Sequence, residues 1–204
     1  MSPLRPDLAV ISDWIAPKAR ILDLGCGDGA LLAYLSRTRG VRGYGLEIDP
    51  DNVVRCVASG VNVIHADLDE GLRGFESNSF DYVVMTQALQ ALQRPDHVVA
   101  EMLRVGKTAI VTFPNFGHWR VRLGLLGGRM PNTPALPDEW YSTENIHLCT
   151  VADFDDLCAE NGWKVLRRSL LDHERRDDWV IRLAPNLFAE NALYMLQTGS
   201  AGAK

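Results

Sequence analysis

Apolar and polar positions along the chain follow two alternating patterns. Short apolar runs are each followed by a segment in which apolar residues recur at helical spacing. The apolar runs predict strands at residues 19–24, 43–48, 61–65, 80–85 and 107–113. The segments between them predict helices at 30–37, 50–59 and 95–103. Strand, helix and strand repeated in this way predict a doubly wound α/β fold with a mostly parallel sheet.

This rhythm stops after the fifth predicted strand. Residues 115–148 are rich in Gly, Pro, Arg and aromatic side chains, and they are too long for a plain connection. Within this insertion, Trp119, Leu123 and Leu126 share one side of a predicted helix. Such a stripe most often packs on the core, and the alternative is a cap that also presents a surface to another protein. We expect one domain over residues 1–204, with the insertion at about 115–148 forming a cap or a partner surface.

Regular elements return in the last third of the chain. Thr150 is a favourable helix N-cap residue, with Asp153 three positions later, and it predicts a helix that follows directly. Strands are then predicted at 163–171 and 191–196. The segment 172–178 between them is dense in charges of both signs, and we expect it to be a solvated loop.

Composition and charge narrow the class of protein. The 204 residues are 47% hydrophobic and 23% charged, which is the balance of a globular protein. A net charge of −5 argues against a general nucleic-acid binder. The four cysteines are scattered and no histidines cluster with them, so we expect neither a metal site nor a disulfide framework. No apolar run has the length of a signal peptide or a membrane span, which predicts a cytoplasmic protein without a membrane partner.

The first predicted strand ends in a glycine-rich loop, which is the main candidate for ligand chemistry. Residues 23–29 read Asp-Leu-Gly-Cys-Gly-Asp-Gly and lead into a helix whose first N–H groups are free to bind a ligand. A dinucleotide motif also fits these glycines. However, Asp23 and Asp28 would each repel a pyrophosphate, by on the order of 1 kcal/mol or more. Both acids would attract the ammonium and sulfonium of S-adenosylmethionine. We expect that cofactor, or S-adenosylhomocysteine, to contact Asp23, Gly25, Cys26, Gly27 and Gly29.

The ends of the second and fourth predicted strands add further candidates. Glu47 follows the loop by about 20 residues, the spacing at which an acid accepts from ribose hydroxyls. Asp49 competes with Glu47 for this role, and Ile48, which lies between them, is a further expected cofactor contact. After the fourth strand, Thr86 and Gln87 lie at the carboxyl end of the sheet, where ligands of such folds bind. They either line the cofactor or are ordinary polar loop residues.

The residues at the end of the third predicted strand are suited to bind the adenine base of the cofactor. A carboxylate at Asp67 can accept a hydrogen bond from the exocyclic amine of adenine. The backbone N–H of Leu68 can then donate to the ring. Asp69 and Glu70 are alternatives for the acid.

Two resemblances support this interpretation. The motifs from 23–29 to 80–84 resemble the class I S-adenosylmethionine-dependent methyltransferases, which implies a Rossmann-like seven-stranded sheet with an antiparallel C-terminal strand. Further segments are similar to the methionine biosynthesis protein MetW family, namely 87–90, 114–123, 128–131, 140–141 and 145–150. Membership would imply an S-adenosylmethionine-binding protein that acts with or regulates homoserine O-acyltransferase, and a homodimer is compatible with it. The alternative is an active methyltransferase for an unidentified small molecule.

Four residues are candidates for acceptor chemistry. His118 and His147 have side chains that act as general bases near neutral pH, and Asn115 and Tyr141 are polar residues of the same insertion. A single loop histidine is more often a hydrogen-bonding residue. Methyl transfer can proceed largely through alignment of the acceptor with the sulfonium, so both the binding protein and the enzyme stay open.

Overall fold

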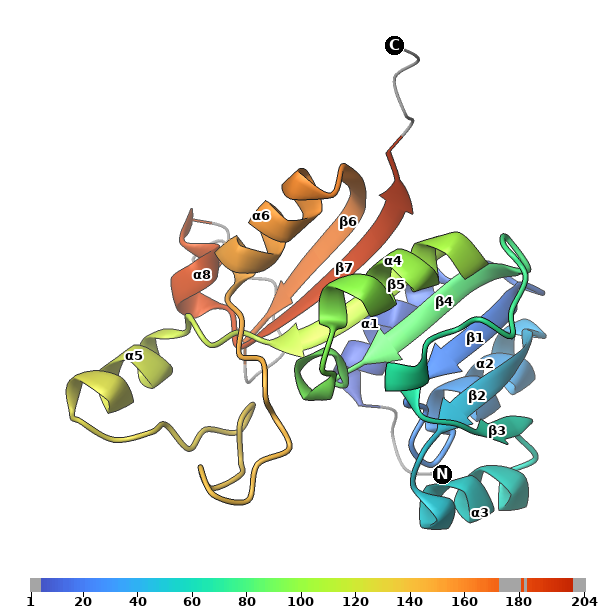
Figure 1. The fold of residues 1–204 in the computed structure, drawn as a ribbon, viewed down its shortest axis with the longest axis horizontal. Helices are drawn as coiled ribbons and strands as arrows, with labels where there is room; N and C mark the ends of the chain where they lie inside the picture. The colour runs from blue at the N-terminus through green and yellow to red at the C-terminus, as the bar shows by residue number, and fades with distance from the viewer. Residues whose placement is uncertain (1–4, 173–180, 182, 200–204) are drawn as a thin grey trace.

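The computed structural model describes residues 5–172, 181 and 183–199, which form a seven-stranded sheet with helices on both faces (Figure 1). The strand order is β3-β2-β1-β4-β5-β7-β6. The strands are β1 (Arg20–Leu24), β2 (Arg42–Glu47), β3 (Val63–His65), β4 (Phe80–Thr86), β5 (Gly106–Pro114), β6 (Trp163–Leu171) and β7 (Asn191–Thr198). Strands β1 to β5 pair in parallel, and β7 is antiparallel to both β5 and β6. The predicted doubly wound, mostly parallel sheet with an antiparallel C-terminal strand is confirmed.

Helices cover the two faces of this sheet. The helices in the described part of the chain are α1 (Pro6–Trp14), α2 (Ala30–Arg39), α3 (Pro50–Ala58), α4 (Pro95–Val105), α5 (Trp119–Leu126), α6 (Val151–Glu160) and α8 (Pro185–Phe188), with 3₁₀ turns η1 (Leu68–Glu70) and η2 (Leu89–Ala91). In Figure 1, α4 and α6 lie in front of the sheet and α1 and α2 behind it. Leu22 and Val83 belong to the front core, whereas Ile21 and Val84 belong to the rear core. Because both faces are covered, the central strands consist mostly of buried apolar residues, and Asp23 is among the polar exceptions.

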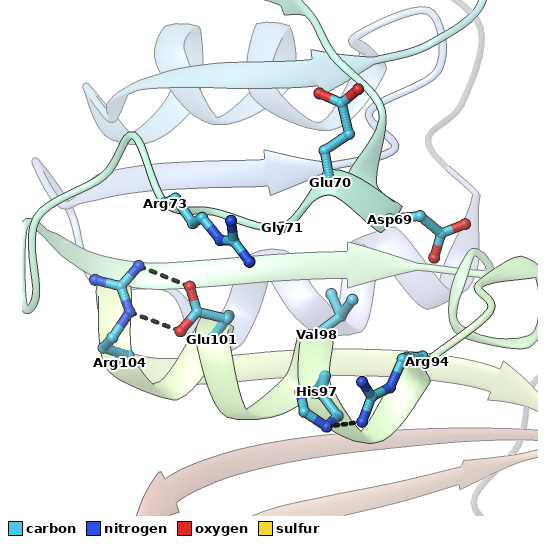
Figure 2. A pocket seen from close by; sticks show the side chains of 9 residues that line it. All are labelled: Asp69, Glu70, Gly71, Arg73, Arg94, His97, Val98, Glu101 and Arg104. Carbon is cyan, nitrogen blue, oxygen red and sulfur yellow. Dashed lines mark hydrogen bonds and ion pairs between the residues drawn. The ribbon is translucent and has the colours of Figure 1, made fainter.

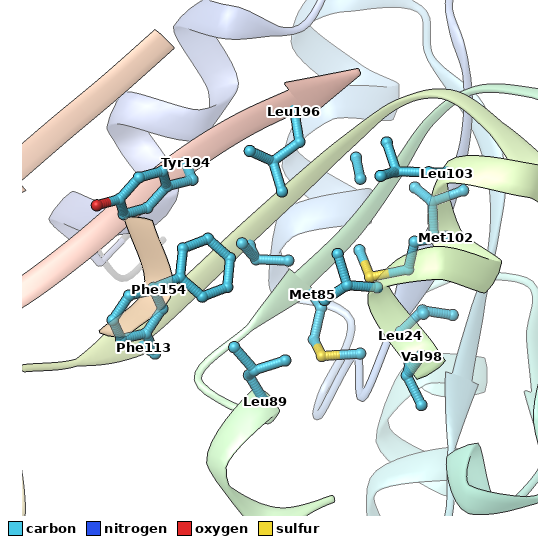
Figure 3. Close-up of a cluster of buried hydrophobic side chains, with 14 of the residues drawn as sticks. Leu24, Met85, Leu89, Val98, Met102, Leu103, Phe113, Phe154, Tyr194 and Leu196 are labelled. Carbon is cyan, nitrogen blue, oxygen red and sulfur yellow. The ribbon is translucent and has the colours of Figure 1, made fainter. Parts of the chain in front are cut away.

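The front core ends in three buried aromatic rings (Figure 3). The ring centroid of Phe154 in α6 lies 4.7 Å from that of Phe113 in β5 and 4.8 Å from that of Tyr194 in β7. The Tyr194 hydroxyl donates to Asp155 at 2.8 Å, so the polar group of this ring is satisfied. The cluster therefore fastens α6 across the junction between the parallel strands and the antiparallel pair.

Local signals in the sequence set most element boundaries. The predicted strands and helices agree with the observed ones to within two residues at each end. Helix α6 begins with a complete capping box formed by Thr150 and Asp153. The predicted loop at 172–178 lies outside the described residues apart from Asp172. Among the described residues, no helix combines the length and the apolar character that crossing a membrane requires.

The insertion forms α5 and an irregular segment beyond the carboxyl ends of the parallel strands (Figure 1). The buried residue of α5 is Val121. At about 3.6 residues per turn, the stripe of Trp119, Leu123 and Leu126 faces away from Val121. Their exposed fractions are 39%, 57% and 82%, so the expectation that this stripe packs on the core is wrong. Helix α5 projects past the end of β5, away from the layers that cover the sheet (Figure 1).

Candidate functional site

The glycine loop lies at the point where the strand order reverses. Strand β1 sits between β2 and β4, and ligands of open α/β sheets bind beyond the carboxyl ends of the strands at such a point. Gly25, Gly27 and Gly29 have φ angles of 65°, 56° and 75°, a region that favours glycine. A Cβ on Gly25 would lie 3.2 Å from the Cβ of Ala88, whereas a Cβ on Gly27 would meet nothing within 4 Å. The loop is thus tightly packed at Gly25 and open to a ligand at Gly27.

A cavity of about 920 Å³ lies against the loop, and its size is that of a small-molecule pocket. It brings together five of the residues that the sequence predicts as cofactor contacts: Asp23, Gly25, Cys26, Gly27 and Thr86. The remaining walls include Arg5 and Leu8 at the start of the chain, Leu31 and Tyr34 of α2, and Asn52 and Arg55 of α3. The sequence motif and the cavity therefore coincide.

Asp23 is a buried carboxyl group in this cavity. Asp23 is 1% exposed, and its Oδ1 accepts no hydrogen bond from the described residues. Burial raises the pKa of Asp23 to about 7, the positive charge of Arg5 opposes that rise, and the negative charge of Glu47 adds to it. An ionised carboxylate without a partner is costly in such a place. A cationic group in the cavity would remove that cost.

Glu47 ties the end of β2 to the glycine loop. Its Oε2 accepts the Gly27 N–H at 2.7 Å, and its Oε1 accepts the N–H groups of Ile48 and Asp49 at 3.0 and 2.9 Å. The competing acid, Asp49, is the N-cap of α3 and accepts the Asp51 N–H at 2.9 Å. Of the two acids, Glu47 is the one whose side chain reaches the loop.

Two buried thiols lie beneath the loop. The Sγ atoms of Cys26 and Cys56 are 3.7 Å apart, and the Cys56 thiol donates to the Gly27 carbonyl at 3.1 Å. Burial raises the pKa of both thiols, so they stay protonated and pack as small apolar groups. Gly45 leaves room for this arrangement, since a Cβ there would lie 2.3 Å from the Cys26 Sγ.

Further predicted cofactor contacts follow β2 and β3, namely Ile48, Asp67 and Leu68. Ile48 exposes 57% of its surface, although it is apolar. Asp67 is exposed and its Oδ1 accepts the Asp69 N–H at 2.9 Å, while Leu68 is buried. The competing Asp69 accepts the N–H of Gln93 at 3.0 Å and so links η1 to the segment before α4. An exposed apolar side chain and an exposed carboxylate are what a base-binding edge needs, and the two assignments stay predictions.

Gln87 is directed away from the cavity. Its φ of 57° is unusual for a residue other than glycine. Its N–H donates to the Thr112 hydroxyl at 3.0 Å, and its side-chain amide donates to Asn191 Oδ1 at 3.1 Å. Thr86 lines the cavity and Gln87 does not. Gln87 therefore connects the end of β4 to β5 and β7.

Asn115, a candidate for acceptor chemistry, is buried in a hydrogen-bonded hub at the base of the insertion. Its Nδ2 donates to the carbonyls of Asn186 and Ala189 at 3.2 and 2.7 Å. Its Oδ1 accepts the N–H groups of Gly117 and Val151 at 2.9 and 3.2 Å. This side chain thus joins β5, α6 and α8, which accounts for its burial without a substrate.

The other three acceptor candidates are spread over the insertion. His118 is buried and its ring centroid lies 5.6 Å from that of Trp119. His147 is exposed, with its ring Nε2 3.1 Å from the Gln93 carbonyl oxygen, and Tyr141 is exposed. Neither these three residues nor Asn115 belong to the described lining of the cavity beside the glycine loop.

Arg5 and helix α1 are parts of the site that sequence reasoning missed. Arg5 lines the cavity, and its guanidinium also pairs with Asp7 at 2.9 Å. The available signal was the spacing of Leu8, Ile11 and Ile15, all of which are buried in the rear core. Helix α1 thus brings a positive charge to the cavity that contains Asp23.

A second cavity, of about 540 Å³, lies between η1 and α4 (Figure 2). Its charged residues comprise the acids Asp69, Glu70 and Glu101 and the bases Arg73, Arg94, His97 and Arg104. Arg104 forms two bonds to Glu101, at 2.7 and 2.8 Å, and also donates to the carbonyls of Leu72 and Phe75. Arg94 contacts His97. Because charges of both signs line this cavity and Arg104 is already bonded to Glu101 and to two backbone carbonyls, we assign no ligand to it.

The fold is shared with solved methyltransferase structures. A chain in the complex of the Haloferax volcanii Trm112 methyltransferase activator with a methyltransferase superimposes with a TM-score of 0.68. It is 18% identical, and the match covers 97% of this chain and 91% of that chain. An S-adenosylmethionine-dependent methyltransferase from Mesorhizobium loti gives a TM-score of 0.66 at 18% identity, over 94% and 97% of the two chains. At these identities the likeness concerns the fold.

Sequence relatives define the family. The bifunctional methionine biosynthesis protein MetXA/MetW of Rhodopirellula baltica is 37% identical over 200 residues, which are 93% of this chain and 32% of that protein. The ubiquinone biosynthesis O-methyltransferase of Hahella chejuensis is 35% identical over 113 residues, which are 52% of this chain and 46% of that protein. The chain thus spans less than half the length of either relative. Residues 5–196 match the family described as methionine biosynthesis protein MetW, and the chain therefore belongs to the MetW family.

Proposed function

We propose that this chain binds S-adenosylmethionine, or S-adenosylhomocysteine, beside the glycine loop, and that it acts with homoserine O-acyltransferase as a regulatory partner in methionine biosynthesis. The observation that carries the ligand assignment is Asp23, a buried carboxyl group in the cavity whose Oδ1 lacks a hydrogen-bond partner among the described residues. S-adenosylmethionine carries its methyl group on a positively charged sulfur. It also has an ammonium, which can donate a hydrogen bond to Asp23 Oδ1.

The charges around the cavity fit an amino-acid moiety. Asp23 offers a carboxylate for the ammonium, and Arg5 offers a guanidinium for the carboxylate. The open backbone at Gly27 allows this part of the ligand to approach closely. A dinucleotide would instead bring phosphates against Asp23 and Asp28, which also lines the cavity. The donor set therefore fits a zwitterionic ligand better than a pyrophosphate.

The strand ends beside the loop fit a nucleoside. The carboxylate of Glu47 already accepts three backbone N–H groups and lies at the position where ribose hydroxyls are bound in related folds. Ile48 and Asp67 offer an apolar surface and an acceptor for adenine. These residues would orient the nucleoside so that its 5′ end points to Gly27.

The partner assignment rests on family and on protein architecture. The relative from Rhodopirellula baltica is named MetXA/MetW, and the part that matches this chain is 32% of it. A protein that joins two functions in one polypeptide keeps both at high effective concentration. S-adenosylmethionine is made from methionine, so a protein that senses it suits control of homoserine activation. We place this activity in the cytoplasm.

An active methyltransferase is the second candidate, and the fold of its structural neighbours favours it. The acceptor candidates Asn115, His118, His147 and Tyr141 all lie outside the described lining of the cavity, which makes the binding role the better supported one. Incubation with cofactor labelled in the methyl group and a metabolite extract tests the enzyme. Transfer of label into a metabolite would establish it, and absence of transfer by protein that binds the cofactor would remove it.

Two measurements test the proposed function itself. Titration calorimetry with S-adenosylmethionine, S-adenosylhomocysteine and NAD should give binding of the first two and none of the third. The acyltransferase should co-purify with this chain, and its activity should change when the chain is added with and without S-adenosylmethionine. Binding of NAD alone would refute the ligand assignment. Two purified proteins that do not associate at micromolar concentration would refute the partner.

A further inference from the structure

The apolar stripe on α5 is exposed to solvent, whereas an amphipathic helix normally buries its apolar side. Trp119, Leu123 and Leu126 lie on the side opposite the buried Val121. Exposed apolar side chains that occur together on one element are typical of interaction sites. Tryptophan is also among the residues most enriched at the energetic centre of interfaces. The stripe therefore has the chemistry of a docking surface.

Helix α5 is held firmly at its base, so the exposure of the stripe does not result from a loose end. Arg120 forms an ion pair at 3.2 Å with Glu190, a buried residue that directly precedes β7. The guanidinium of Arg122 donates to the Gly117 carbonyl at 2.6 Å. Val121 inserts into the protein between these two anchors. The polar and inward contacts of α5 thus fix its outward stripe in one orientation.

The segment after α5 adds a small apolar hollow to the same insertion. The hollow measures about 40 Å³ and is lined in part by Phe116, Met130, Pro131, Leu136 and Trp140. Pro131 lies against α5, because a Cβ on Gly124 would be 3.4 Å from it. Met130 and Trp140 are exposed at its edge. A hollow of this size accepts the tip of one apolar side chain, as an interface anchor requires.

We propose that the α5 stripe and this hollow form the surface on which homoserine O-acyltransferase docks, an inference that rests on the proposed function. The Rhodopirellula baltica relative combines MetXA and MetW in its name, and about two thirds of it lie outside the match to this chain. The insertion also exposes aromatic and aliphatic side chains on a helix that the ion pair between Arg120 and Glu190 anchors to the core. An apolar centre with arginines at its margin is the composition of protein–protein interfaces.

The test compares two double variants in the full chain. Leu123→Glu with Leu126→Glu places two charges on the stripe, at positions already exposed to water. Val54→Glu with Val57→Glu makes the same change on α3, where both valines are also exposed and neither lines the cavity beside the glycine loop. Each variant is titrated with S-adenosylhomocysteine as a check of folding and is then mixed with purified acyltransferase. Affinity for the acyltransferase is measured by interferometry. The mass of each variant alone is measured by light scattering, which shows whether the chain forms a dimer.

The stripe variant should lose about tenfold or more in affinity for the acyltransferase, while the α3 variant and the binding of S-adenosylhomocysteine stay unchanged. If the native chain does not bind the acyltransferase, the proposed function fails. If the native chain binds and the stripe variant binds equally well, the docking surface is wrong although the proposed function stands. If the stripe variant instead breaks a dimer of this chain and keeps the acyltransferase, the surface belongs to a second copy and the inference is overturned.

Discussion

The Gly27 N–H donates to Glu47 Oε2 across 2.7 Å, so a side chain from the end of β2 fixes the loop that follows β1. The same carboxylate accepts the N–H groups of Ile48 and Asp49. Its burial keeps water from replacing these bonds. The loop and the strand that it borders are therefore held together, and we expect Glu47 to contribute to stability as well as to the proposed ligand binding.

Glu47→Ala should lower the free energy of unfolding by about 1–3 kcal/mol, because the Gly27 N–H loses its acceptor in a buried place. It should also weaken binding of S-adenosylmethionine by about 1.5–3 kcal/mol if the acid meets the ribose. Urea denaturation and calorimetry measure the two effects. Glu76→Ala, at an exposed acid, is the matched control and should change neither. An unchanged affinity in Glu47→Ala would remove this residue from the site.

Asp23→Asn should change stability and binding in opposite directions. Protonation of Asp23 stabilises the folded state fully below its unfolded pKa of 3.8, and this contribution is lost as the pH rises to the folded pKa of about 7. The native protein should therefore become less stable between about pH 4 and pH 7 with a slope that the variant lacks. At pH 8 the variant should melt at a higher temperature and bind S-adenosylmethionine more weakly. If the stability of the native protein and of the variant changed with pH in the same way, the raised pKa of Asp23 would be contradicted.

Ligand binding should itself depend on pH through Asp23. An ammonium beside this carboxyl favours its ionised form and lowers its pKa from about 7, so binding releases a proton near neutral pH. Affinity for S-adenosylmethionine should then rise as the pH increases from 6 to 8. Calorimetry in buffers with different ionisation enthalpies measures the proton release. Methylthioadenosine, which lacks the ammonium, is the matched ligand and should release no proton through this group.

Arg5→Ala should weaken binding of S-adenosylhomocysteine by about tenfold, since it removes a positive charge from the cavity where the ligand carboxylate is placed. Methylthioadenosine should bind the variant and the native protein equally, because it has no carboxylate. Arg20→Ala, at an exposed arginine outside the cavity lining, serves as the control. Equal losses for both ligands would assign Arg5 to the packing of α1 instead of the ligand.

Asn115→Ala should be strongly destabilising, by about 2–4 kcal/mol, because the carbonyls of Asn186 and Ala189 and the Gly117 N–H lose a buried partner together. Thermal denaturation measures this, with Asn62→Ala at an exposed position as the control. A variant that keeps native stability but loses methyl transfer would show that Asn115 serves an acceptor and not the base of the insertion.

The sequence predicted the parts of the fold that depend on local pattern. Continuous apolar runs located the buried strands, and Thr150 with Asp153 located the start of α6. Periodicity says which residues share a side of a helix, but it does not say what lies opposite them. For this reason the stripe that includes Leu123 was placed on the core, although the structure exposes it. Helix α1 was missed because charged residues and a proline mask its short apolar repeat.

The candidate site was predictable to the extent that it follows strand ends. Asp23, Gly27 and Thr86 meet in one cavity because parallel strands end at the same edge of the sheet. The sequence pattern did not predict the direction in which each side chain at a strand end points. Gln87 follows β4, which lies two strands from β7 in the sheet, and it reaches Asn191 because the antiparallel strand begins at this edge. The contribution of Arg5 also depends on how α1 packs, which no local motif records.

The hydrogen bond from the Cys56 thiol to the Gly27 carbonyl affects how much the loop must change when the proposed ligand binds. Together with Glu47, it holds the loop backbone in place before any ligand arrives. Little conformational entropy then remains to be lost on association. A receptor with such a preorganised site binds its ligand without an ordering step that would lower its apparent affinity.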